Sequence, residues 1–114
     1  MTHQEIAEMI AGIGLPYALD HFAKDDGAHP QSPPFICFFY PNDDDFIADN
    51  ANYARITTLT IELYTDAIEF DLEDTVESTL IAAGLPFTKT QTYIESERMY
   101  QTSYNTEVCL NAPE

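Results

Sequence analysis

The segment Gly-Leu-Pro occurs twice in this sequence, at residues 14–16 and 84–86, and an aromatic residue follows each copy. A glycine supplies the left-handed residue that ends a helix, and a proline prevents the helix from continuing. Each copy therefore predicts the end of a helix and the start of an extended segment. The whole chain of 114 residues is long enough for one domain, and we expect a single domain over residues 1–114.

The stretch before each stop shows helical periodicity. Before the first, apolar residues recur at i, i+3, i+4 and i+7, namely Ile6, Met9, Ile10 and Ile13. Thr2 and Glu5 have the spacing of a capping box. Asp66 is expected to cap a second helix that ends near residue 83. The apolar side of this helix consists of Leu72, Val76, Leu80 and Ala83. Its first turns are acidic, which the helix dipole favours, and carry Glu69, Asp71, Glu73, Asp74 and Glu77.

The remaining apolar segments are typical of strands. Residues 35–40 are six consecutive apolar residues and predict a strand covered on both faces. Residues 54–64 alternate between apolar and polar side chains, which predicts one dry and one wet face. Residues 87–94 and 99–110 are expected to form a hairpin through residues 95–98. The sequence thus predicts an α+β fold of order α-β-β-α-β-β, with two helices on one face of a mostly antiparallel four-stranded sheet.

The charge of the chain is its most unusual property. Twenty acidic residues oppose four Lys and Arg, so the formal net charge is −16. Four cations cannot neutralise many phosphates, which argues against binding to nucleic acid or to anionic membranes. We also expect no membrane span and no secretory signal, because no long apolar run and no basic N-terminal region are present. Three interpretations of the acidity remain: solubility, mimicry of DNA, or repulsion of DNA from a surface that DNA must pass.

No catalytic or cofactor motif stands out. The three histidines lack metal-binding spacing, and the two cysteines lie in apolar runs, which favours reduced, buried thiols. There is no glycine-rich phosphate loop and no Gly-x-Ser-x-Gly motif. We therefore expect no cofactor, and an enzyme is the class with the least support.

One loop, residues 41–53, combines acids with apolar side chains. Its carboxylates are Asp43, Asp44, Asp45 and Asp49. A calcium loop is excluded, because Ala48 stands at the sixth position, where glycine is required. The cluster is then either a solvated turn or an acidic protein contact. Phe46, Ile47 and Tyr53 are candidate interface residues, since apolar groups in a polar loop suggest binding; alternatively, they fold back over the core.

Four segments together resemble a family of small bacteriophage proteins. They are PPFICFFYPN at residues 33–42, FIADNANY at 46–53, IELYT at 61–65 and KTQTYIESERMY at 89–100. The family is encoded between the head-tail joining and major tail genes of long-tailed phages and prophages of Gram-positive bacteria. The similarity spans about residues 4–110, and the element order also looks like the tail-terminator fold.

The resemblance implies a virion structural protein of the tail-terminator kind, made in the host cytoplasm and located at the head-tail junction. Such a protein would form a hexameric ring, cap the tail tube, contact the tube protein and the head connector, and let DNA pass without binding it. A charge of −16 per copy suits that conduit, because it repels phosphate. Two alternatives remain: another head-closure or adaptor component, and an acidic DNA mimic that inhibits a DNA-binding enzyme.

Overall fold

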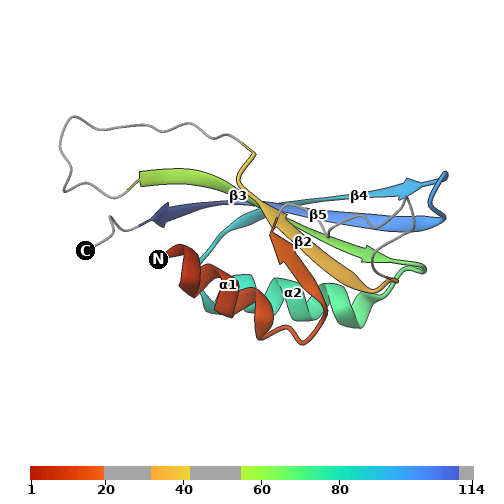
Figure 1. Cartoon of the computed structure of the whole chain (residues 1–114), viewed down its shortest axis with the longest axis horizontal. Coiled ribbons are helices and arrows are strands. Elements are labelled where there is room, and N and C mark those ends of the chain that lie inside the picture. Colours follow the sequence, from red (N-terminus) through yellow and green to blue (C-terminus); the bar gives the residue numbers. More distant parts are fainter. Residues whose placement is uncertain (20–31, 42–54, 111–114) are drawn as a thin grey trace.

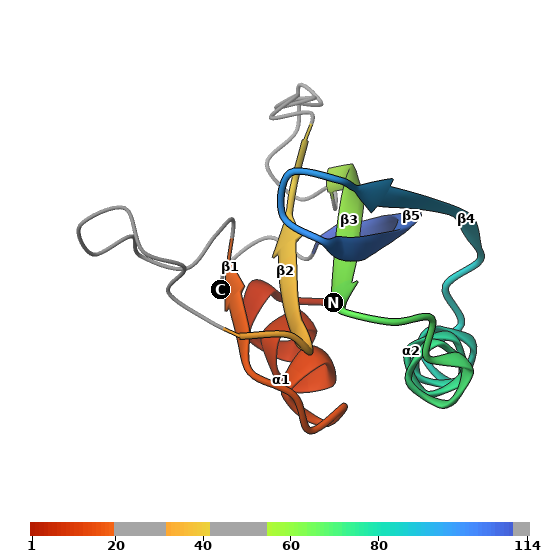
Figure 2. The same cartoon turned by 90° about the vertical axis from the view of Figure 1, so that its right-hand side faces the viewer.

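A five-stranded mixed sheet forms the centre of the computed structural model, and both helices pack against one of its faces (Figures 1 and 2). The structure describes residues 1–19, 32–41 and 55–110. The elements are α1 (His3–Ala11), β1 (Tyr17–Leu19), β2 (Phe35–Phe39), β3 (Arg55–Thr65), α2 (Phe70–Ala82), β4 (Phe87–Ile94) and β5 (Met99–Leu110). The strand order is β1-β2-β3-β5-β4, so β1 and β4 form the two edges.

The predicted four-stranded sheet is wrong, although the chain is α+β with two helices. The additional strand is β1, which pairs in parallel with β2 from Tyr17 opposite Ile36 to Leu19 opposite Phe38. The stop at residues 14–16 predicts an extended segment from Tyr17, but three residues are too few to show the alternating pattern of a strand in the sheet. A parallel pair also needs a long connection, and residues 20–34 provide one. The order is therefore α-β-β-β-α-β-β and the sheet is mixed rather than mostly antiparallel.

The first helix begins where the sequence predicts, but it ends at Ala11 with Gly12 as its C-cap, three residues before the predicted Gly14. The Thr2 side chain accepts a hydrogen bond from the Glu5 backbone N–H, and the Glu5 carboxylate accepts one from the Thr2 N–H at 2.8 Å. Ile6 and Ile10 are fully buried against the sheet. Gly14 has a φ of +92°, a conformation that glycine adopts without steric cost. The capping box thus sets the start of α1, and Gly14 lies in the turn that follows the helix.

The second helix starts later than predicted. Its N-cap is Glu69, whose side chain makes no capping bond, and Asp66 lies outside the helix. The reason is that β3 continues to the buried Thr65, and residues 66–69 lead the chain from the sheet to the helix layer. At the other end, Gly84 N–H donates to Ile81 O and Leu85 N–H donates to Leu80 O, both at 2.9 Å, which is the Schellman pattern.

The predicted strands after residue 34 are confirmed. Three consecutive residues of β2 are buried, Ile36, Cys37 and Phe38, so this strand is covered on both faces. The dry face of β3 is Leu59, Ile61 and Leu63, all with no exposed surface. β4 and β5 pair from Phe87 opposite Thr106 to Ile94 opposite Met99, and residues 95–98 form the turn.

One thiol differs from its prediction. Both cysteines are free, but only Cys37 is buried, and Cys109 is exposed. On β5 the neighbours of Cys109, Val108 and Leu110, point into the core. Because successive strand residues point to opposite faces, Cys109 must lie on the outer face of the sheet.

Candidate functional site

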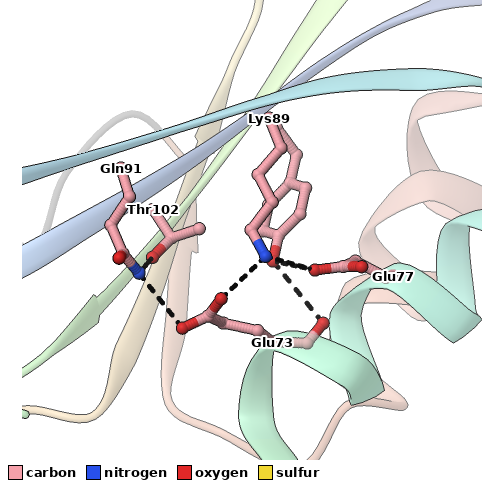
Figure 3. A network of polar contacts seen from close by, with 6 residues as sticks. Glu73, Glu77, Lys89, Gln91 and Thr102 are labelled. Carbon is pink, nitrogen blue, oxygen red and sulfur yellow. Dashed lines mark hydrogen bonds and ion pairs between the residues drawn. The ribbon is translucent and has the colours of Figure 1, made fainter. Parts of the chain in front are cut away.

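A cluster of polar side chains lies between α2 and the edge strand β4 (Figure 3). At its centre is Glu73, a glutamate of α2 that is only 3% exposed. The Lys89 Nζ of β4 lies 2.7 Å from Glu73 Oε1 and 2.8 Å from Glu77 Oε2. One lysine thus pairs with two carboxylates that are one helical turn apart.

Two donors, Gln91 and Tyr104, and one acceptor, Thr102, complete the cluster. Gln91 Nε2 donates to Glu73 Oε2 at 3.1 Å and to Thr102 Oγ1 at 2.9 Å (Figure 3). Tyr104 Oη donates to Glu77 Oε2 at 2.9 Å, and Lys89 Nζ lies 5.9 Å from the centre of the Tyr104 ring. Within the described residues, every buried side-chain nitrogen and oxygen has a hydrogen-bond partner. The buried charge of Glu73 is therefore compensated by a cation and a donor.

The electrostatics of the cluster fix its protonation states. The hydrogen bonds of Lys89 to Glu73 and Glu77 raise the pKa of the lysine, so its ammonium group stays charged. The hydrogen bond from Lys89 lowers the pKa of Glu77. Burial, followed by the hydrogen bond to Glu77, raises the pKa of the Tyr104 hydroxyl, which stays protonated. These three groups are held in the charge states they already have at neutral pH, so the arrangement suits a clamp between helix and strand.

Sequence reasoning missed this cluster. It assigned Glu73 and Glu77 to the acidic first turns of a helix, where carboxylates are common whether or not they are buried. The available signal was the spacing: the two glutamates are at i and i+4, and Lys89 is one of four cations in the chain. Residues 88–92, around Lys89, are all polar. The sequence therefore does not indicate which of their side chains point toward the helix.

The edge of the sheet beside this cluster is open. β4 pairs with β5 on one side, and no described strand pairs with its other side. Next to it, α2 exposes two large apolar side chains, Phe70 at 71% and Ile81 at 68%. Glu77 lies seven residues after Phe70 and four before Ile81, so all three share one side of α2. Since Glu77 contacts Lys89 of β4, that side is the flank of the helix that borders the open edge.

The opposite edge of the sheet holds a groove of about 640 Å³. Its lining comes from α1, β1 and β2 and consists of His3, Gln4, Ala7, Tyr17, Ala18, Leu19, Phe38 and Tyr40. His3 Nδ1 and Tyr40 Oη are 2.9 Å apart, and their rings meet edge to face. Tyr17 and Leu19 remain 41% and 59% exposed. Both edges therefore present apolar surface that the described part of the chain leaves uncovered.

The residues predicted to form an interface are not among those the structure describes. Phe46, Ile47, Tyr53, Asp43, Asp44, Asp45 and Asp49 all lie outside the described ranges. Their predicted role as contacts stays a prediction. Residues 1–19, 32–41 and 55–110 contain no group of three or more His, Cys, Asp or Glu placed to hold a metal ion. No helix within these ranges has the length and apolar character to cross a membrane.

Comparisons with protein-family models and with curated proteins found no match to this chain. The function is therefore proposed from the sequence resemblance, the sheet edges and the charge.

Proposed function

We propose that this chain is a structural protein of a long-tailed phage virion, a tail terminator that forms a ring on the tail tube. The proposal starts from the resemblance of residues 33–42, 46–53, 61–65 and 89–100 to phage tail proteins. The observation that supports it most is the sheet: among the described strands, β1 and β4 each pair with a neighbour on one side only. An unpaired strand edge invites pairing with another chain, so a subunit with two such edges suits side-by-side assembly.

The distribution of charge supports a conduit for DNA. Six of the twelve residues at positions 66–77, the segment that leads into α2 and forms its first half, are acidic. No acid occurs in β4 (Phe87–Ile94), the neighbouring edge strand. A ring of such subunits would place many carboxylates on its helix layer, and a surface of that kind repels phosphate. Repulsion lets DNA pass through the ring without binding.

The partners follow from this role. The ring would consist of copies of this chain, six in number in the tail-terminator arrangement. One rim would contact the major tail tube protein and the other the head connector. Its place would be the head-tail junction of the virion, after synthesis in the host cytoplasm. The mechanism is assembly, and it requires neither a cofactor nor a membrane.

Solution mass tests the proposal directly. Light scattering across a concentration series, with negative-stain images, should show a species of six subunits with a central hole. If the chain stays monomeric, the same measurement is repeated after co-expression with the tail tube protein of the same phage. A chain that forms no ring under either condition would overturn the proposal. Tight binding of such a monomer to a basic DNA-binding enzyme would then establish the DNA mimic, whereas a ring that binds connector but not tube would indicate a head-closure component.

A further inference from the structure

We propose that copies of this chain join head to tail, with the α2–β4 flank of one copy seated in the α1–β1 groove of the next. The α2–β4 flank is Phe70, Ile81 and the free edge of β4, and the α1–β1 groove is the cavity described above. This inference rests on the ring of the proposed function and adds which two surfaces form its interface. The occupant of the groove is thus a second copy of this chain.

The shapes of the two surfaces are complementary. The flank protrudes, because Phe70 and Ile81 expose most of their side chains on one side of α2. The groove recedes, and its lining contains four aromatic or large aliphatic residues, Tyr17, Leu19, Phe38 and Tyr40. Burial of an exposed Phe or Ile in such a lining removes apolar surface from water on both partners. Neither surface matches a second copy of itself in this way, so the contact is heterologous.

The layers of the subunit allow the same contact to repeat. α1 lies beneath β1 and β2, whereas α2 lies beneath β4, and both helices are on the same face of the sheet (Figure 2). When β4 of one copy lies beside β1 of the next, α2 of the first comes beside α1 of the second. The flank then faces the groove, and the sheet continues across the interface. A heterologous contact of this kind produces a ring when its rotation closes.

The charges of the groove and of β4 suit this pairing. Each copy carries −16, so copies repel one another wherever acids face acids. The groove is lined by eight residues, none of them acidic, and β4 contains no acid. Of the two carboxylates between Phe70 and Ile81 on this side of α2, Glu77 is paired with Lys89 and Asp74 is exposed. The lining of the groove and β4 thus bring no acid to the contact, which on the α2 side must leave the exposed Asp74 in water.

Three single substitutions, each adding one carboxylate at an exposed apolar position, test the interface in the full chain. Ile81→Glu alters the flank, and Leu19→Glu alters the groove. Ile56→Glu is the matched control, because Ile56 is 64% exposed on β3, away from both surfaces. Thermal melts of the three variants check that each one folds. Assembly is measured by light scattering and native mass spectrometry under the condition in which the wild-type chain forms rings.

We expect the flank and groove variants each to need at least about 10-fold more protein to assemble, which is 1.4 kcal/mol per interface. The control should assemble as the wild type does. A mixture of the flank and groove variants should give a dimer of one of each, because that pair retains a single intact contact. Rings that form normally with Ile81→Glu or Leu19→Glu would overturn the head-to-tail inference and leave the proposed function standing. A wild-type chain that forms no ring, alone or with the tube protein, would overturn both.

Discussion

Replacement of Lys89 by methionine should lower the free energy of unfolding by about 2 kcal/mol. The change removes both ion pairs, at 2.7 and 2.8 Å, and keeps most of the packing of the side-chain stem. Glu73 would then be a carboxylate with a 4% exposed side chain and Gln91 as its remaining side-chain donor. Loss of one partner from a fully buried pair costs about 3–5 kcal/mol. Lys89 itself is 35% exposed, so water can partly replace it, and we reduce the estimate to about 2 kcal/mol.

The assay is urea denaturation at pH 7, at a protein concentration where all variants are monomeric, since assembly would add to the apparent stability. A loss of about 2 kcal/mol corresponds to a fall of roughly 8 °C in melting temperature for a domain of this size. Two variants serve as controls. Glu77→Gln should cost less than about 1 kcal/mol, because its side chain is 25% exposed. Lys89→Met with Glu73→Gln should recover at least half of the loss, since the buried charge is then absent.

Two results would refute the reasoning about the cluster. One is a loss below about 0.5 kcal/mol for Lys89→Met, the value of an ordinary surface pair. The other is a double variant no more stable than Lys89→Met alone, which would mean that the charge of Glu73 is not the source of the cost.

Three further predictions concern the fold. Thr2→Ala removes the capping box of α1 and should cost about 1 kcal/mol in chemical denaturation, whereas Thr2→Ser should retain most of the stability. Leu59→Ala leaves a cavity at a fully buried position of β3 and should cost about 3 kcal/mol; a loss under 1 kcal/mol would contradict its place in the core. Because Lys89 holds the pKa of Glu77 below its ordinary value of 4.5, the stability from this pair is complete above pH 4.5 and is lost as the pH falls through the lowered pKa. Stability curves measured from pH 7 to pH 3 should therefore fall more steeply for the wild type than for Glu77→Gln.

The parts of the fold that were predictable are those with local signals. The capping box at Thr2 and Glu5 and the left-handed Gly14 are short-range features, and they mark the start of α1 and the turn that follows it. The hairpin of β4 and β5 has a turn between two long extended segments. By contrast, β1 has three residues, and its parallel pairing with β2 depends on contacts formed only in the folded chain.

The candidate site was less predictable, because its residue types look the same in exposed and buried places. Glu73 is one acid among several at a helix start, and nothing nearby in the sequence marks it as buried. Phe70 and Ile81 are easier to recognise from the sequence, because both fall outside the apolar stripe of α2, which includes Val76 and Leu80. A large apolar residue outside the stripe of an amphipathic helix indicates either a second contact or an exposed interface.

The cluster and the proposed interface depend on one another through Lys89. This lysine lies on the edge strand and pairs with Glu77, which with Asp74 is one of two carboxylates between Phe70 and Ile81 along the flank. Without that pairing, a second copy approaching the flank would meet a second free negative charge beside that of Asp74, which a chain of −16 cannot easily bury. Lys89, the single cation of β4, thus stabilises the subunit through its pair with Glu73. Through its pair with Glu77 it neutralises one negative charge on the flank. Because the two effects involve different carboxylates, they are separable: loss of the Glu73 pair should appear in unfolding, and loss of the Glu77 pair should appear mainly in assembly.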